Sequence, residues 1–397
     1  MGVTGGIAAY KAAELVRGLV KAGARVQVIM TAAAQQFITP LTLQTLSGQP
    51  VGTDLFGLES EARIGHIHMA RAAQLVVVAP ATANVMAKMA AGIADDYLTT
   101  TILAGRAPVL ICPAMNVAMW EHPATRRNLN TLRELGYHVL EPEAGALACH
   151  EEGSGRLADL SSIMESCRRL LTPPTLRGRR VLVSAGPTWE FLDPVRFISN
   201  PSTGKMGYAL AAVAARRSAE VHLVSGPTHL PEPYGVNLHR VTSAVQMKEA
   251  VTRLSGDMDA IIMAAAVSDY RAAEAAPQKV KKIEERSFIA LARNPDILAS
   301  LGEERRNAAN VLIGFAAETE HLVENAAEKL VRKNLDLIVA NDLTETGSGF
   351  GEDTNRVKVL DRGGGVTELP LLTKEAVAER IWDRIEQLIE ERASEGV

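Results

Sequence analysis

The residues with the clearest chemical potential in the first half of the chain are a histidine, an asparagine and a cysteine. His66 can move protons near neutral pH. Asn116 lies among apolar residues in 113-PAMNVAMW, where an amide needs a hydrogen-bonding partner that a ligand can supply. Cys149 lies in the glycine-bearing segment 147-LACHEEGSGRL, which is typical of a reactive thiol rather than a packed one. Together they favour proton-transfer chemistry; taken singly, a structural histidine and a turn-capping asparagine are the alternatives.

A glycine-rich turn near the start of the chain predicts a phosphate site. Gly5 and Gly6 would let backbone N–H groups approach a phosphate at a helix N-terminus, and a turn without a ligand is the alternative. The spacing is not GxGxxG, and the next candidate strand ends in Thr31 rather than in the acid that holds the ribose of NAD. Thr82 and Asn84 place a hydroxyl and an amide after a further strand. This half therefore suits a mononucleotide such as FMN over NAD.

The second half carries a polar, glycine-bearing turn that leads into a helix. The run 203-TGKM is no P-loop, because the pattern GxxxxGK[ST] fails at positions 199 and 206. It predicts either an anion site at a helix N-terminus or a helix capped by Ser202 or Thr203. Asn200 lies just before this turn.

Charged residues after the later strands predict a nucleotide site. Asp269 follows the candidate strand 259-DAIIMAAAV and could hold a ribose hydroxyl or a metal-bound phosphate. The basic run that begins at Lys279 would by itself indicate a solvated face. So close after an acidic strand end, it resembles a triphosphate site. Lys329 and Lys333 lie one helical turn apart and share a face.

The elements that must position these residues are those of an α/β protein. Short apolar runs without alternation indicate strands buried on both faces, joined by alanine-rich helices, and so predict two Rossmann-like domains with parallel sheets. The pattern breaks at 172-TPPTLRGRR, which predicts a first domain over 1–172, a linker over 173–180 and a second domain over 181–397. Strands are expected at 26–30, 75–79, 109–112, 138–140, 181–188, 221–226, 259–266, 311–318 and 337–342, and helices at 9–23, 204–217, 319–333 and 374–392.

The composition limits the function classes. The chain has 397 residues, 47% of them hydrophobic and 22% charged, which excludes a disordered chain. The formal net charge of −4 excludes a generally basic nucleic-acid binder. No apolar stretch approaches the ~20 residues that span a bilayer. Three cysteines without a CxxC pair, and no export signal, predict a cytoplasmic protein with reduced thiols.

The segments GGIAAYK, GHI, APATAN, PAMNVAMW and ACHEEGSGR resemble the flavin-dependent cysteine decarboxylases over residues 2–160. The resemblance implies a flavodoxin-like, FMN-binding domain that assembles as trimers. It also implies that His66 is the active-site histidine, Asn116 the substrate-binding residue and Cys149 the proton donor on a flap. His150 and Glu151 stand where that family often has Gly and Asp, which alters the flap. The flavin would be lined by Gly5, Gly6, Ile7, Thr31, Thr82, Asn84 and Ala114.

The chemistry implied by this resemblance matches the residue types. FMN would oxidise the thiol-bearing carbon of a cysteinyl substrate to a thioaldehyde, so that the carboxylate lies β to C=S and CO₂ can leave. Cys149 would protonate the resulting enethiolate, and reduced FMN would return the hydride.

The segments SAGPTWExxDPVRFISNxSTGKMG, AAAVSDYR, KVKK, NPDIL and GFAAET resemble the phosphopantothenate–cysteine ligases from about 181 to 390. With both halves in one chain, the sequence resembles the bacterial bifunctional coenzyme A biosynthesis proteins. The resemblance implies that CTP and Mg²⁺ activate 4'-phosphopantothenate as an acyl-cytidylate, which the amine of cysteine then attacks with release of CMP. It implies dimers through this half, and possibly a dodecamer overall.

Site residues of the ligase half follow from the same resemblance. Asn200 would act on the acyl-cytidylate, Lys279 would assist the attack of cysteine, and Asp269 would hold the metal. The CTP contacts would be Met263, Ala264, Ala265, Asp269, Lys279, Pro295, Asp296, Ile297, Leu298, Phe315, Lys329 and Lys333.

Other classes of protein share this type of fold. A flavin-binding prenyltransferase is disfavoured by PAMNxxMW together with Cys149, and an NAD-linked oxidoreductase by the missing strand-end acid. A regulatory flavoprotein, such as a phosphatase-inhibitor subunit, would not need both Cys149 and an intact ligase half.

Overall fold

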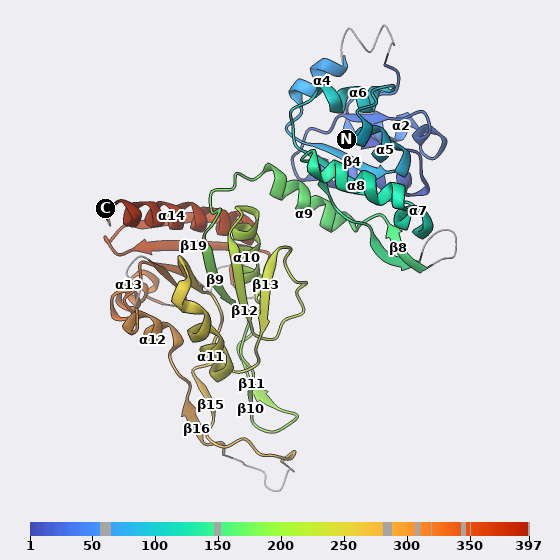
Figure 1. The fold of residues 1–397 in the computed structure, drawn as a ribbon. Helices are drawn as coiled ribbons and strands as arrows, with labels where there is room; N and C mark the ends of the chain where they lie inside the picture. The colour runs from blue at the N-terminus through green and yellow to red at the C-terminus, as the bar shows by residue number, and fades with distance from the viewer. Residues whose placement is uncertain are drawn as a thin grey trace. The chain divides into compact units, whose positions relative to one another are not determined.

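The chain divides into two compact units, Met1–Thr172 and Pro173–Val397. The computed structural model describes residues 1–55, 65–146, 152–280, 288–305, 310–318, 320–342, 347–349 and 351–395. Each unit has its own sheet with helices on its faces (Figure 1). Within these ranges, no helix combines the length and the apolar character needed to cross a membrane.

The sheet of the first unit has the strand order β3-β2-β1-β4-β5-β6, with every pair parallel. This is the order of Rossmann folds rather than the 2-1-3-4-5 order of flavodoxin. The prediction of a Rossmann-like domain is therefore confirmed. The strand order differs from that of flavodoxin, to which the resemblance had likened this domain. The strands are β1 (Gly2–Val3), β2 (Val28–Met30), β3 (Val51–Gly52), β4 (Val76–Ala81), β5 (Val109–Pro113) and β6 (His138–Val139).

The helices of this unit begin and end at residues that suit such positions. Thr82 accepts a hydrogen bond from the Val85 N–H at the start of α5, and Asp96 forms a capping box at the start of α6. Gly48 and Gly92 end α2 and α5 in the left-handed conformation. The helices are α1 (Lys11–Lys21), α2 (Pro40–Ser47), α4 (His66–Ala72), α5 (Ala83–Ala91), α6 (Tyr97–Ala104), α7 (Val117–Glu121), α8 (Pro123–Glu134) and α9 (Leu160–Leu171), and a hairpin of β7 (Glu143–Ala146) and β8 (Glu152–Arg156) precedes α9.

The sheet of the second unit is parallel from one edge through β18 and then turns antiparallel. Its order is β13-β12-β9-β14-β17-β18-β19-β20, and β18–β19 and β19–β20 are antiparallel pairs. The sequence predicted the parallel part and missed the antiparallel edge. The strands are β9 (Arg180–Ala185), β12 (Glu220–Ser225), β13 (Val236–Arg240), β14 (Ala260–Met263), β17 (Val311–Glu318), β18 (Leu337–Asp342), β19 (Thr354–Asp361) and β20 (Val366–Thr373).

Alternate residues of these strands enter two cores on opposite faces of the sheet. Val181 and Val183 pack with α10 (Lys205–Arg216) and α14 (Lys374–Glu395). Leu182 packs on the other face with α11 (Ala244–Leu254), α12 (Ile297–Glu303) and α13 (Leu322–Arg332). In Figure 1, α10 and α14 lie side by side. The continuously apolar strands are therefore buried on both faces, as their pattern predicted.

Two short ribbons extend from this sheet. They are β10 (Glu190–Phe191) with β11 (Phe197–Ile198), and β15 (Tyr270–Ala272) with β16 (Leu291–Arg293), and Figure 1 shows them at the end of the unit away from α14. Leu176, in the segment expected to be a linker, is buried in the core of the second unit, and its N–H donates to the Arg217 carbonyl (2.9 Å).

Candidate active sites

The loops after β1 and β4 meet where the strand order of the first unit reverses, and open α/β sheets bind ligands at such a switch point. The Thr4 hydroxyl donates to the Pro80 carbonyl (2.7 Å) and accepts from the Thr82 N–H (3.0 Å). This threonine ties the turn that contains Gly5, Gly6 and Ile7 to the segment that contains Thr82 and Asn84. The structure therefore brings the flavin-site residues predicted on these loops to one edge of the sheet.

The glycine at position 5 is required by a close approach of two loops. A Cβ on Gly5 would lie 2.4 Å from the Ala33 Cβ, in the loop after β2. In that loop, the Thr31 hydroxyl accepts the Ala34 N–H (3.3 Å), so it serves the backbone. Ile7 is 61% exposed and Asn84 is also exposed, so both are accessible to a ligand.

Asn116 and Ala114 follow β5, next to the switch point. The Ala114 N–H donates to the Ala81 carbonyl (3.0 Å), which joins the ends of β4 and β5. Asn116 is the N-cap of α7, and its Oδ1 accepts the Met119 N–H (2.9 Å). Asn116 therefore does cap a helix, which was the alternative to a ligand-binding role. Its Nδ2 group would be the donor to a ligand.

The remaining predicted residues of this half are only partly described. His66 is half-buried at the first position of α4. Cys149, His150 and Glu151 lie outside the described residues. Cys112 and Cys167 are buried. Burial raises the pKa of the Cys167 thiol to about 11 and raises that of Cys112 further, which keeps both protonated and unreactive.

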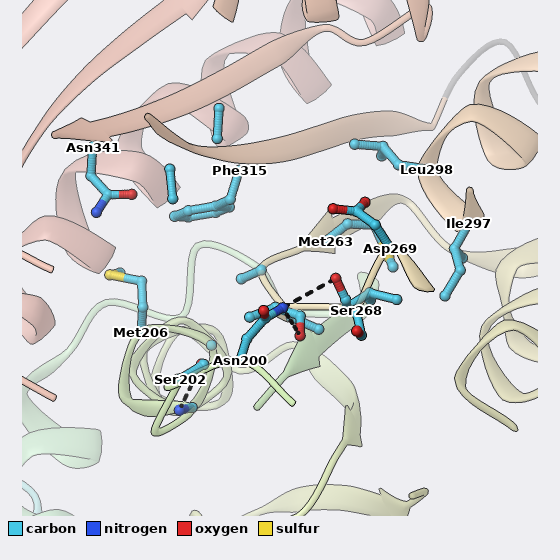
Figure 2. A pocket seen from close by; sticks show the side chains of 18 of the residues that line it. Asn200, Ser202, Met206, Met263, Ser268, Asp269, Ile297, Leu298, Phe315 and Asn341 are labelled. Atoms are coloured by element: carbon cyan, nitrogen blue, oxygen red, sulfur yellow. Dashed lines mark hydrogen bonds between the residues drawn. The ribbon is translucent and has the colours of Figure 1, made fainter. Parts of the chain in front are cut away.

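The second unit contains a cavity of about 470 Å³ at the carboxyl ends of its parallel strands. Figure 2 shows Met206 and Asn341 on one side of it, Ile297 and Leu298 on the other, and Phe315 between them. The structure brings together here all the ligase-site residues predicted from the sequence except Lys279. They are Asn200, Met263, Ala264, Ala265, Asp269, Pro295, Asp296, Ile297, Leu298, Phe315, Lys329 and Lys333.

Backbone contacts hold two of the loops that line the cavity. The Asn294 N–H donates to the Asp269 carbonyl (2.8 Å), and the Asn294 side chain donates to the Ser268 carbonyl (2.8 Å). These bonds fix the start of α12 beside the loop after β14. Gly314 lets β17 approach this region, since a Cβ there would lie 2.8 Å from Leu298 Cδ2.

Asn200 lies at the floor of the cavity, as Figure 2 shows. Its Nδ2 group donates to the carbonyls of Ala266 (3.1 Å) and Val267 (3.3 Å). Both amide protons are therefore used to hold the loop after β14. The Asn200 side-chain oxygen is left as an acceptor for a ligand.

Two lysines at the C-terminal end of α13, Lys329 and Lys333, form ion pairs with carboxylates. Lys333 Nζ lies 2.8 Å from Asp296 Oδ2, and Lys329 pairs with Glu318. Burial alone would raise the pKa of Asp296, but hydrogen bonds from Lys333 and from the Ala299 N–H outweigh it and lower the pKa. This side of the cavity is therefore nearly balanced in charge, which suits an uncharged group such as a nucleobase.

Lys279 does not line the cavity. It is exposed, and the neighbouring Val280 N–H donates to Asp193 Oδ2 (3.1 Å) while the Val280 carbonyl accepts from Arg196 (3.0 Å). Asp193 is buried, and Arg196 together with the N–H groups that surround it holds its pKa well below the usual range. The segment that carries Lys279 is thus anchored to the turn between β10 and β11.

Sequence reasoning missed several residues at the cavity. Lys205, Asn355 and Lys374 line it. Asn355 lies on β19 of the antiparallel edge that was not predicted, and Lys374 begins α14, directly after β20. The sequence did contain a signal for Lys205 and Lys374, because each lies at the start of a predicted helix. The N-terminus of a helix is its positive end and disfavours a cation, so a lysine there is unusual. In the described part of the chain, no group of His, Cys, Asp or Glu side chains is arranged to hold a metal by itself.

Comparison with known proteins places both units in known families. The flavoprotein family model matches residues 1–172, and that of the DNA/pantothenate metabolism flavoprotein C-terminal domain matches residues 176–389. The coenzyme A biosynthesis bifunctional protein CoaBC of Vibrio cholerae is 48% identical over 98% of this chain and 97% of its own length. The CoaBC of Bacillus subtilis is 47% identical over 97% of this chain and 96% of its own.

One solved structure, the crystal structure of the C-terminal domain of a CoaBC protein, is 44% identical. It covers 55% of this chain and 99% of that chain, with a TM-score of 0.48. The sequence identity along nearly the whole length, together with the two family matches, decides the assignment. The chain belongs to the family of bifunctional coenzyme A biosynthesis proteins.

Proposed function

We propose that the second unit joins cysteine to 4'-phosphopantothenate with CTP and Mg²⁺, and that the first unit, with FMN bound, decarboxylates the product to 4'-phosphopantetheine. The observation that carries this proposal is the cavity of the second unit. Strands and helices distant in the sequence bring Asn200, Asp269 and Phe315 around one space of suitable size for a nucleotide. The full-length match to bifunctional relatives supports it.

In the ligase reaction, the carboxylate of 4'-phosphopantothenate attacks the α-phosphorus of CTP and pyrophosphate leaves. The nucleobase would lie among Phe315, Ile297 and Leu298. Asp269 would hold Mg²⁺ together with the phosphates, because magnesium sites commonly combine one protein carboxylate with substrate oxygens. The amine of cysteine then attacks the acyl carbon and CMP leaves, with Asn200 positioning the acyl-cytidylate. Lys279, which lies outside this cavity, is given no role in this step.

In the decarboxylase reaction, FMN fits the switch point between β1 and β4. The turn that contains Gly5 would present backbone N–H groups to a phosphate. The hydrogen bond from the Thr82 N–H to Thr4 holds the segment of Thr82 and Asn84 next to this turn. When bound, FMN supplies the oxidation that makes loss of CO₂ possible. The protein binds the substrate through Asn116 Nδ2, keeps His66 near the reaction and donates a proton from Cys149.

Gly155→Ala should damage this first activity alone. The Met115 N–H donates to the Gly155 carbonyl (3.0 Å), and an added Cβ would lie 2.3 Å from the Met115 oxygen, so β8 must move away from Asn116. We expect a loss of ~1–3 kcal/mol of stability and slower decarboxylation of supplied 4'-phosphopantothenoylcysteine, with unchanged ligation.

Gly18→Ala is the matched control, because its Cβ would meet Met164 Sδ at an ordinary 3.6 Å inside α1. It should be neutral or stabilising by about 0.5–1 kcal/mol. Native decarboxylation by Gly155→Ala would show that β8 does not support the site.

The nucleotide requirement tests the ligase proposal. The full chain is incubated with 4'-phosphopantothenate, cysteine and Mg²⁺, with either CTP or ATP, and pyrophosphate release is measured. We expect release that depends on CTP and stops when a chelator removes Mg²⁺. Pyrophosphate release with ATP but not with CTP would overturn the nucleotide assignment. Release in excess chelator would overturn the metal assignment. The flavin absorption spectrum of the purified chain tests FMN binding in the same preparation.

The assembly and the location are part of the same proposal. We place the protein in the cytoplasm and expect a homo-oligomer, with trimers through the first unit and dimers through the second. Native mass measurement of the full chain tests the oligomer, and a monomer at working concentration would contradict it.

A further inference from the structure

The loop over residues 264–269 is bonded to β9 and to the segment that follows β9. This loop comes directly after β14, lines the cavity and, apart from one bridge at Ala266, belongs to no strand. Its backbone N–H and C=O groups therefore need other partners. Ser184 Oγ accepts the Ala265 N–H (3.1 Å), and the Gly186 carbonyl accepts the Ala266 N–H (2.9 Å). The position of the loop thus depends on contacts with a neighbouring segment.

Thr188 provides the last of these contacts and is fully buried, with 0% exposure. Its Oγ1 accepts the N–H of Ser268 (3.1 Å), the residue directly before Asp269. Its carbonyl accepts the hydroxyl proton of Ser199 (2.9 Å), the residue directly before Asn200. Thr188 does not itself line the cavity. It therefore holds the neighbours of two site residues without reaching the space where a substrate would bind.

Asn200 completes a closed set of contacts around Thr188. Its Nδ2 group donates to the carbonyls of Ala266 and Val267, as the dashed lines in Figure 2 show. The loop after β14 is thus bonded both to Thr188 and to Asn200, and the segment of Asn200 is bonded to Thr188. Because the contacts form a ring, a displacement at Thr188 is passed to both sides of the cavity floor.

We propose that Thr188 is a positioning residue of the ligase reaction, whose hydroxyl oxygen sets the placement of Asp269 and, through the same ring of contacts, of Asn200. The inference deepens the proposed function and rests on it for the roles of these two residues. Thr188 acts through them and touches neither the nucleotide nor the acid substrate. Small errors in the placement of reacting groups are costly, since a displacement of about 1 Å can slow an enzyme about 100-fold.

Thr188→Val removes the oxygen and keeps the shape of the side chain. A methyl carbon rests roughly 3.5–4.0 Å from a non-bonded neighbour, whereas Thr188 Oγ1 lies 3.1 Å from the Ser268 nitrogen. The loop must therefore move away, and a buried N–H loses its acceptor. We expect the kcat of ligation to fall about 10–100-fold. The Mg²⁺ concentration that gives half the maximal rate should rise, because Asp269 moves with the loop.

Thr188→Ser distinguishes positioning from packing. It keeps the oxygen and deletes a buried methyl group, so it should lower the thermal midpoint and yet restore ligation to within about threefold of the native rate. Val251→Ala is the control for stability alone, because Val251 is fully buried on α11 and does not line the cavity. It should lower the thermal midpoint and ligate at the native rate with the native Mg²⁺ dependence.

Amide hydrogen exchange of residues 264–269, measured by mass spectrometry on the full chain, tests the contact without turnover. Thr188→Val should speed exchange in this loop about tenfold or more, whereas Thr188→Ser and Val251→Ala should leave it near the native rate. Ser199→Ala removes the other bond of Thr188 at a partly exposed position. It should slow ligation about threefold or more, and it serves if Thr188→Val fails to fold.

Three results would overturn the positioning role. They are native exchange in this loop of folded Thr188→Val, native ligation by that variant, and ligation rates of the two Thr188 variants that simply follow their thermal midpoints. For Ser199→Ala, ligation at the native rate would count in the same way. The expected change in exchange, in a chain that ligates nothing even without substitution, would contradict only the proposed function.

Discussion

Cys149→Ser will stop the formation of 4'-phosphopantetheine while the ligation of cysteine to 4'-phosphopantothenate continues at its native rate. A serine hydroxyl is a far weaker acid than a thiol, so the proton that completes decarboxylation is not delivered. Positioned proton donors contribute about 10²–10⁴-fold to rates, and we expect a loss in that range. The measurement is the rate of 4'-phosphopantetheine formation from supplied 4'-phosphopantothenoylcysteine beside the rate of ligation in the same preparation.

Cys167→Ala is the control for this substitution. Cys167 is buried, with its thiol pKa raised to about 11 by that burial, so its removal affects packing and not proton transfer. We expect lower thermal stability with both activities retained. Two results would count against the assignment. One is native formation of 4'-phosphopantetheine by Cys149→Ser, and the other is an equal loss of both activities, which would contradict two separate sites.

Asn200→Asp will reduce ligation about 100-fold or more and leave decarboxylation unchanged. Asn200 Nδ2 donates to the carbonyls of Ala266 and Val267. A carboxylate would set an anionic oxygen against these two carbonyl oxygens and add negative charge where anionic substrates bind. A lost hydrogen bond that leaves a buried group unsatisfied costs ~1–3 kcal/mol, and two of them correspond to a rate loss of this size.

The matched control is Asn237→Asp, an exposed asparagine on β13 that does not line the cavity. It introduces the same charge at a distance from the site and should ligate at the native rate. The rate of pyrophosphate release and the thermal midpoint are measured for both variants. A folded Asn200→Asp that ligates within about threefold of the native rate would remove Asn200 from the site.

The location of both sites at the strand ends was predictable from the sequence, because the carboxyl ends of parallel strands share one edge of a sheet. Met263 ends β14 and Asp269 lies in the loop after it, while Phe315 lies in the second half of the neighbouring β17. They meet at one cavity for this reason. The same rule places the turn after Gly5 next to Thr82 in the first unit.

Other positions depend on contacts that the sequence does not encode locally. Lys279 is only ten residues beyond Asp269, but the β15–β16 ribbon leads the chain away from the cavity, and Asp193 anchors it elsewhere. Lys374 and Asn355 reach the cavity because β19 and β20 fold back on β18 as antiparallel strands. Neither strand pairing could be deduced from periodicity, which gives the faces of a strand and not its neighbours.

The central claim is that one chain performs two successive reactions, and the products of a complete reaction mixture test it most directly. The purified chain with FMN is incubated with 4'-phosphopantothenate, cysteine, Mg²⁺ and CTP, and the products are identified by mass spectrometry. We predict 4'-phosphopantetheine, CMP, pyrophosphate and CO₂ in equal amounts. Accumulation of 4'-phosphopantothenoylcysteine alone would contradict the activity of the first unit, and the absence of any product would contradict the claim as a whole.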